Sequence, residues 1–161
     1  MPERRLAGRW QKPQQITCQD GTTVVLPRAP RILAYFLCSA YVLAGSIEFL
    51  IDTGADITTI MPDDRANIVI PSYALVSGCP EVMIGVGGGV PIKYLENVTL
   101  EFQDEEGEVL PAIALNRIGV LNPPAQQTGA YRGTPSLLGR DFLSRCRVDL
   151  ASDSILLCYR D

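Results

Sequence analysis

An apolar run that stops at an acidic residue constrains this chain more than any other stretch. Residues 49–51 read Phe-Leu-Ile and lead directly into Asp52, Thr53 and Gly54. The run predicts a buried strand, and the glycine allows a turn that leaves the Asp52 carboxylate at the end of that strand. An aspartate in this position either caps a turn or takes part in acid–base chemistry. Three residues are too few to decide between these alternatives, so the rest of the chain has to decide.

Two later stretches favour the chemical alternative. Residues 83–92 are β-prone arms around a cluster of glycines, which predicts a hairpin with a glycine-rich tip. Residues 136–143 begin as a buried apolar strand and turn into a short helix. Together with residues 51–56, and in this order, these stretches resemble the retropepsin family of aspartic proteases. The resemblance covers residues 31–160.

The resemblance implies a fold and a set of site residues. The implied fold is all-β: a closed retropepsin-like acid-protease barrel with one short C-terminal helix and one active-site aspartate per subunit. Asp56 and Arg140 match family positions that form an ion pair, although two exposed charges would contribute little, and Asp141 is expected to cap the helix. The implied catalytic residues are Asp52, Thr53 and Gly54; the substrate-binding residues are Ala55, Asp56, Ile84, Gly85, Val86, Gly87, Gly88, Pro135 and Leu137; structural support comes from Leu138, Gly139, Arg140 and Asp141.

The glycine cluster at residues 85–89 has a competing interpretation as a phosphate-binding loop. That interpretation fails because no Gly-Lys-Ser/Thr follows the glycines, and Pro91-Ile92 continues as strand where a helix would be required. In the family this hairpin is a flap that closes over a bound peptide. Gly87 stands where retroviral members carry a bulky apolar residue, so we expect weaker contact between two flaps and weaker binding of peptides.

Composition excludes several other functions. The chain has no histidine, which removes Ser-His-Asp and Cys-His mechanisms and zinc sites that need imidazole. Its five cysteines are widely spaced without a Cys-x-x-Cys pair, so we expect reduced thiols, no metal, no cofactor and a cytoplasmic location. A net charge of −4 argues against a nucleic-acid partner. The uncharged residues 32–47 are fewer than the roughly 20 that a membrane helix needs, so no membrane partner is expected.

The chemistry that remains for peptide hydrolysis is a pair of carboxylates that share one proton and activate a water molecule. The chain has one Asp-Thr-Gly, and the Asp-Leu-Ala-Ser at residues 149–152 is no substitute. A second copy of the chain is therefore expected to supply the second carboxylate, which makes the active species a homodimer with Asp52 at its two-fold axis. The resemblance implies that Thr53 bonds across that axis. The predicted function is an aspartic endopeptidase acting on a peptide or protein substrate; the alternative is a non-catalytic retropepsin-fold module that binds peptides or dimerises.

The chain is expected to have an N-terminal extension over residues 1–30 and a protease domain over residues 31–161. The extension is expected to be a flexible arm over residues 1–13 and a hairpin whose turn is Asp20-Gly21. In the family the chain termini commonly interleave into a sheet between the subunits, and residues 155–159 are expected to be such a strand, because their edge would otherwise stay unpaired. Alternatively, this strand pairs only within its own subunit, and the Asp52-Thr53-Gly54 loops and the flaps hold the dimer. The other expected elements are two strands within residues 32–47 that are joined at residues 44–46, strands at residues 57–60, 109–115 and 147–150, and a long loop at residues 116–135.

Overall fold

Strands are the commonest regular element in this computed structural model, which describes residues 3–85 and 88–161. The strands are β1 (Arg4–Trp10), β2 (Gln14–Thr17), β3 (Thr23–Leu26), β4 (Pro30–Cys38), β5 (Leu43–Ile51), β6 (Thr59–Ile60), β7 (Val82–Gly85), β8 (Gly88–Glu101), β9 (Ile113–Leu121), β10 (Leu137–Leu138), β11 (Cys146–Leu150) and β12 (Ile155–Tyr159). The α-helices are α1 (Pro62–Ile68) and α2 (Arg140–Leu143), and 3₁₀ turns cover Ser39–Tyr41, Ser72–Ala74 and Ala125–Tyr131.

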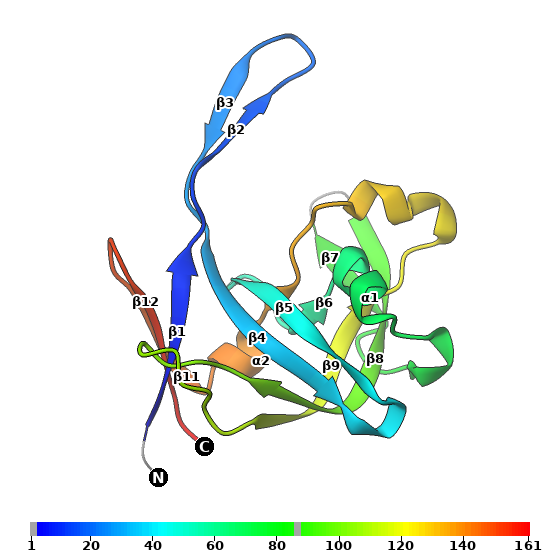
Figure 1. Cartoon of the computed structure of the whole chain (residues 1–161). Coiled ribbons are helices and arrows are strands. Elements are labelled where there is room, and N and C mark those ends of the chain that lie inside the picture. The colour runs from blue at the N-terminus through cyan, green and yellow to red at the C-terminus, as the bar shows by residue number, and fades with distance from the viewer. Residues whose placement is uncertain (1–2, 86–87) are drawn as a thin grey trace.

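Ten of the strands form one sheet in the order β11-β12-β1-β4-β5-β10-β6-β9-β8-β7. Because β8 also pairs with β4, the sheet curls back on itself, and β2 and β3 form a separate hairpin that projects from the body (Figure 1). The side chains of β4 alternate, so that Ile32, Ala34 and Phe36 are buried, and β5 buries Ile47 and Phe49 in the same way. The predicted β-rich character is confirmed.

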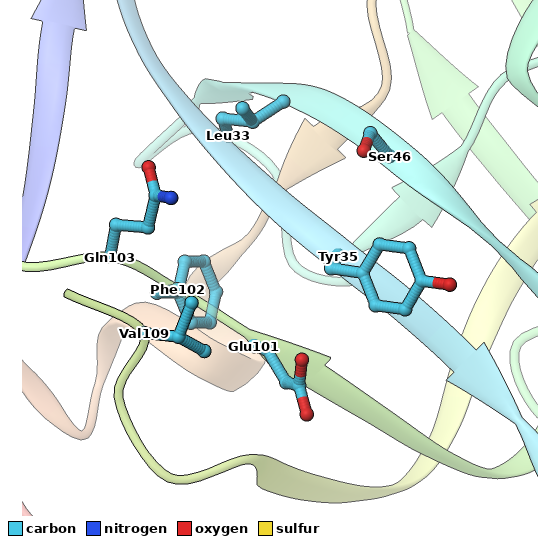
Figure 2. Close-up of a pocket in the computed structure, with 7 residues that line it drawn as sticks. All are labelled: Leu33, Tyr35, Ser46, Glu101, Phe102, Gln103 and Val109. Atoms are coloured by element: carbon cyan, nitrogen blue, oxygen red, sulfur yellow. The ribbon is translucent and has the colours of Figure 1, made fainter. Parts of the chain in front are cut away.

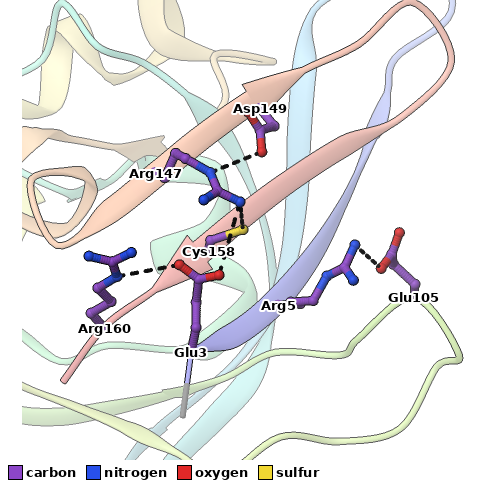
Figure 3. Close-up of polar contacts among 7 residues, drawn as sticks. All are labelled: Glu3, Arg5, Glu105, Arg147, Asp149, Cys158 and Arg160. Atoms are coloured by element: carbon purple, nitrogen blue, oxygen red, sulfur yellow. Dashed lines mark hydrogen bonds and ion pairs between the residues drawn. The ribbon is translucent and has the colours of Figure 1, made fainter. Parts of the chain in front are cut away.

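The prediction of a flexible arm over residues 1–13 is wrong. Residues Arg4–Trp10 form β1, which pairs antiparallel with β12 on one side and with the start of β4 on the other. Leu6 is fully buried in the core, and Arg5 forms an ion pair with Glu105 (Figure 3). The sequence of this segment gives a weak strand signal, because Leu6 is its one buried side chain and Arg5 and Arg9 are exposed. Its pairing partners lie far away in the sequence.

The C-terminal strand β12 lies between β1 and β11 and is hydrogen-bonded along both edges. The expectation that residues 155–159 offer an edge to a second subunit is therefore wrong, and the alternative of pairing within the subunit describes the structure. Polar contacts join these segments: Arg147 of β11 donates to the Cys158 sulfur of β12 (3.3 Å), and Arg160 pairs with Glu3 (Figure 3). Within β11, Arg147 also pairs with Asp149.

Two strands are present within residues 32–47, as predicted, but the turn between them lies earlier than residues 44–46. The chain turns at Ser39–Tyr41, and Val42 adopts a left-handed conformation (φ 54°). Gly45 instead lies inside β5, where an added Cβ would meet Ile68 at 3.0 Å. No helix within residues 3–85 and 88–161 is long and apolar enough to cross a membrane.

Two further expectations about the middle of the chain need correction. A second α-helix, α1, directly follows β6, where the sequence suggested only the end of a strand. The expected strand at residues 109–115 begins at Ile113 and continues to Leu121, into the segment predicted as a loop. Its continuation is buried because Ile118 and Val120 face the core.

The predicted hairpin near the N-terminus is confirmed. β2 pairs with β3 in antiparallel register, and Gly21 takes a positive φ of 82° in the turn. The Asp20 carboxylate accepts hydrogen bonds from the N–H (2.9 Å) and hydroxyl (2.6 Å) of Thr22. The Asp-Gly signal therefore produced the turn that its chemistry predicts.

The thiols are expected to differ in reactivity. All five cysteines are free; Cys18 and Cys79 are exposed, whereas Cys38 and Cys158 are buried. Burial raises the pKa of Cys146 to about 12, so near neutral pH it is protonated and a poor nucleophile. A disulfide reagent added to dilute native protein should react rapidly at the two exposed thiols, and at the other three only after unfolding. Rapid reaction of a third thiol in the folded protein would contradict this arrangement.

Candidate active site

Asp52 is the first residue after β5, at the end of a buried strand. Its backbone N–H donates to the Leu138 carbonyl (3.1 Å), and the N–H of Leu50 donates to the Ser136 carbonyl (2.8 Å). β10 runs parallel to β5 at this point. The predicted catalytic residue is therefore held in place by the predicted support strand.

The turn after Asp52 fixes the direction of its carboxylate. Oδ1 of Asp52 accepts the Gly54 N–H (2.9 Å), and the Asp52 carbonyl accepts the Ala55 N–H (3.2 Å). An added Cβ at Gly54 would lie 3.1 Å from that same carboxylate oxygen, so glycine gives the turn its room. Asp52 is half-buried, while Thr53 and Gly54 are exposed. Asp52 thus caps a turn and also presents a carboxylate at the surface, so the two initial alternatives do not exclude each other.

Behind the turn, the chain crosses the segment before α2 at very short range. A Cβ on Gly139 would lie 2.6 Å from the Ile57 carbonyl carbon and 2.8 Å from the Thr58 nitrogen, so only glycine fits. The buried Thr58 hydroxyl accepts the Gly139 N–H (3.0 Å) and donates to Oδ1 of Asp141 (2.7 Å). These contacts lock residues 52–58 to residues 138–141.

Asp141 has a different role from the helix cap that was predicted. The N-cap position of α2 is Gly139, and Asp141 lies in the first turn. Oδ1 of Asp141 accepts the N–H of Phe142 (2.9 Å) and the N–H of Thr58 (2.8 Å). Asp141 therefore joins the helix to the active-site segment, in addition to satisfying one N–H of the helix.

The ion pair between Asp56 and Arg140 is present in the structure. Both side chains are largely exposed, so the pair adds at most about 1 kcal/mol to stability. Backbone bonds contribute more to this junction, because the Arg140 N–H donates to the Ala55 carbonyl (2.8 Å) and the Asp141 N–H to the Asp56 carbonyl (3.2 Å).

The loop before β10 is anchored to helix α1. The buried Ser136 hydroxyl accepts the Met61 N–H (2.9 Å) and donates to Asp64 (2.6 Å). Asp63 accepts the Gly133 N–H (2.8 Å). The two acids in the first turn of α1 therefore position the segment that contains the predicted substrate-binding residue Pro135.

Sequence reasoning missed the anchoring acids because it missed their helix. Pro62 followed by Asp63 and Asp64 is a signal for a helix N-terminus, since proline suits the first helical position and acids favour the first turn. That signal could have identified α1. Its link to residues 133–136 could not be found in this way, because it depends on tertiary structure.

We expect Ser136→Ala to lower the free energy of unfolding by about 1–3 kcal/mol, because the buried Met61 N–H loses its acceptor. Urea denaturation would measure the change. Ser144→Ala, at an exposed position after α2, is the control and should shift stability by less than about 0.5 kcal/mol. Equal stability of both variants and the unaltered protein would show that the anchor contributes nothing.

The predicted flap corresponds to β7 and the start of β8. These strands pair up to Gly85 opposite Gly88, and Gly88 takes a positive φ of 113°. Ile84 is 84% exposed. Val86 and Gly87, also predicted as substrate-binding, lie outside the described residues.

The base of this hairpin is fixed by an aromatic residue. The Tyr94 hydroxyl donates to the Pro80 carbonyl (2.6 Å), and the Arg117 guanidinium stacks over the Tyr94 ring at 4.1 Å. β8 pairs with β9 and β9 with β6, which connects the hairpin to the segment after Asp52. The structure thus brings residues 52–58 and 136–141 into direct contact. The flap is connected to them indirectly, through the pairing of β8, β9 and β6.

A pocket of about 270 Å³ lies elsewhere, beside the outer side of β4 (Figure 2). It contains none of the site residues predicted from sequence, so it is separate from the predicted catalytic residues. Its lining residues are Leu33, Tyr35, Ser46, Glu101, Phe102, Gln103 and Val109.

No family model matches the chain. Among solved structures, the chain is similar to the crystal structure of a retropepsin-like aspartic protease from Rickettsia conorii, with 16% sequence identity, a TM-score of 0.47, and coverage of 98% of this chain and 99% of that chain.

Proposed function

We propose that this protein is a retropepsin-type aspartic endopeptidase that acts as a homodimer. The observation that carries the proposal is the Asp52 carboxylate at the end of β5, oriented by the Gly54 N–H (2.9 Å) and fixed to β10 through Leu138. The contacts of Gly139 and Thr58 support it, because catalysis requires a reacting group in a fixed position. The proposal includes the closed barrel of that family, which the pairing of β8 with β4 supports.

In the proposed dimer, the Asp52 carboxyls of the two chains share one proton, because like charges about 3 Å apart cannot both ionise. The ionised carboxylate takes a proton from water, and the water oxygen bonds to the carbonyl carbon of the peptide. The protonated carboxyl gives its proton to the carbonyl oxygen, which yields a tetrahedral diol. The C–N bond then breaks: the nitrogen takes a proton from the carboxyl that received it from water, and a diol hydroxyl returns a proton to the other carboxylate.

The proposed substrate is an extended peptide segment that lies between the Asp52 turn and the flap. Ala55, Pro135 and Leu137 are half-buried and would form its walls. Ile84, at 84% exposure in the single chain, is an apolar side chain that a bound peptide could cover. Thr53 is exposed next to Asp52 and would bond across the two-fold axis.

We also propose that the protein works in a reducing compartment such as the cytoplasm. All five cysteines are free, and two of them are exposed. Exposed thiols persist where glutathione and thioredoxin keep them reduced.

A shared active site makes cleavage depend on protein concentration. Each chain supplies one Asp52, so below the dimer dissociation constant a tenfold dilution should lower the cleavage rate about hundredfold. Peptide cleavage measured over a dilution series, with sedimentation velocity at the same concentrations, tests this. A rate that stays proportional to concentration while the protein sediments as a monomer would rule out the shared site.

The function itself is tested by incubating the purified protein with a peptide library and identifying new termini by mass spectrometry. Cleavage should be inhibited by a peptide analogue that has a hydroxyl at the attacked carbonyl, because such a group displaces the water between the carboxyls. Equal cleavage by the Asp52→Asn protein would show that the activity does not depend on Asp52 and would refute the proposal.

A further inference from the structure

The hairpin of β2 and β3 has no packing partner within residues 3–85 and 88–161. All of its strand residues are exposed, and it extends well beyond the body of the molecule (Figure 1). Two-stranded hairpins are marginally stable in water unless another surface covers one face. The hairpin is therefore a candidate for a contact surface.

The strand register separates the hairpin into two different faces. Ile16 pairs with Val24 and Gln14 with Leu26, which places Ile16, Val24 and Leu26 on one face. These three side chains are 40–45% exposed. The opposite face carries Gln15, Thr17, Thr23 and Val25.

The hairpin leaves the sheet at the end that carries Asp52. Trp10 at the end of β1 pairs with Pro30 at the start of β4, and Arg31 pairs with Leu50 of β5, two residues before Asp52. The last residue of β1, the first of β4 and the last of β5 therefore lie at the same end of neighbouring strands.

Side-chain contacts fix the base of the hairpin. The Trp10 indole donates to the Ala151 carbonyl (2.8 Å), and the Arg28 guanidinium lies over its ring at 4.7 Å. The Gln11 side chain accepts hydrogen bonds from Arg31 (3.0 and 2.7 Å). A hairpin with a fixed base loses less entropy on binding than a free segment would.

We propose that this hairpin is an arm that packs its Ile16–Val24–Leu26 face against a second copy of the chain, across the two-fold axis of the dimer. The inference rests on the proposed function, which places that axis at the Asp52 turns. An arm that leaves the sheet at the same end as Asp52 then begins near the proposed axis. A surface near a two-fold axis lies close to its own copy, so like charges on it would repel. Residues 14–26 contain one charged residue, Asp20, which lies at the tip.

Two adjacent valines provide a matched test. Val24→Glu places a charge on the apolar face, and Val25→Glu places the same charge on the opposite face. Both positions are exposed in the single chain (45% and 64%), so both variants should fold as the unaltered chain does, which circular dichroism would verify. Sedimentation equilibrium should show a dimer dissociation constant raised at least about tenfold by Val24→Glu and less than about threefold by Val25→Glu.

The outcomes for the arm and for the protease can be separated. Sedimentation is repeated with Asp52→Asn added to both glutamate variants, because the dissociation constant can then be measured without any cleavage activity. If Val24→Glu weakens the dimer but the unaltered protein cleaves no peptide, the proposed arm is supported and the proposed protease function is refuted. Equal dissociation constants for both glutamate variants, or a monomer at all concentrations, overturn the arm. The arm is also overturned if Val24→Glu leaves the dimer unchanged but abolishes binding of the protein to phosphatidylcholine vesicles.

Discussion

Asp52→Asn is expected to lower the rate of peptide cleavage at least about 10³-fold, because an amide cannot take the proton from water. The fold should remain intact. The asparagine keeps a side-chain oxygen that can accept the Gly54 N–H, and the backbone bond from residue 52 to Leu138 does not involve the side chain. Initial rates on a cleavable peptide, at protein concentrations well above the dimer dissociation constant, would measure the loss.

The control is Asp149→Asn, the same chemical change in the other acidic stretch considered from sequence. Asp149 is exposed on β11 and pairs with Arg147, so its replacement should leave cleavage unchanged. Near wild-type cleavage by the Asp52 variant would refute the aspartic-protease mechanism. If the unaltered dimer binds peptides without cleaving any, the non-catalytic module becomes the better description.

The site elements were predictable because their signals are local. An apolar run that ends at Asp52-Thr53-Gly54 gave β5 and its turn, and Leu137-Leu138 before Gly139 gave β10 and α2. In each case the residues that end the element are adjacent in sequence to those that form it. The contact of Gly139 with Thr58, which joins the two motifs, adds a constraint that neither stretch shows alone.

The missed elements depend on partners that are distant in sequence. β1 has one fully buried side chain, Leu6, and becomes a strand because β12 and β4 flank it. β9 continues through Asn116 and Arg117 because the strand pairs with β8 on one side while Ile118 and Val120 fill the core. Local propensity could not outweigh the polar residues in either segment.

The C-terminal strand shows how such an error changes an experiment. If β12 offered a free edge, deletion of residues 155–161 would test dimerisation. β12 is instead an interior strand, and Leu157 and Tyr159 are fully buried. The deletion would therefore unfold the subunit, and substitutions in the exposed hairpin give a cleaner test of assembly.

The aromatic cluster beneath α2 connects the terminal strands to the active-site segment. The Phe142 ring lies between Phe102 (centroids 5.5 Å apart) and Tyr159 (5.4 Å). All three side chains are at most 2% exposed. Phe142 follows Arg140 and Asp141, whose backbone and side chain hold residues 55–58, so the cluster determines the position of α2 against the site.

Phe142→Ala is expected to lower the free energy of unfolding by about 3–5 kcal/mol, because it removes a ring from the centre of this cluster and leaves a cavity. Thermal or urea denaturation would measure the loss, and cleavage should fall with the folded fraction.

Tyr159→Phe is the matched contrast within the same cluster. The Tyr159 hydroxyl is buried and has no hydrogen-bond partner among the described residues, so its removal should change stability by less than about 1 kcal/mol. Burial raises the pKa of Tyr159. The unfolded chain therefore loses this proton first as the pH rises, and stability falls above the ordinary tyrosine value of 10.0. Tyr159→Phe should reduce this loss of stability at alkaline pH. If Phe142→Ala and Tyr159→Phe lowered the free energy of unfolding equally, the Phe142 ring would not be the main source of the cluster's stability.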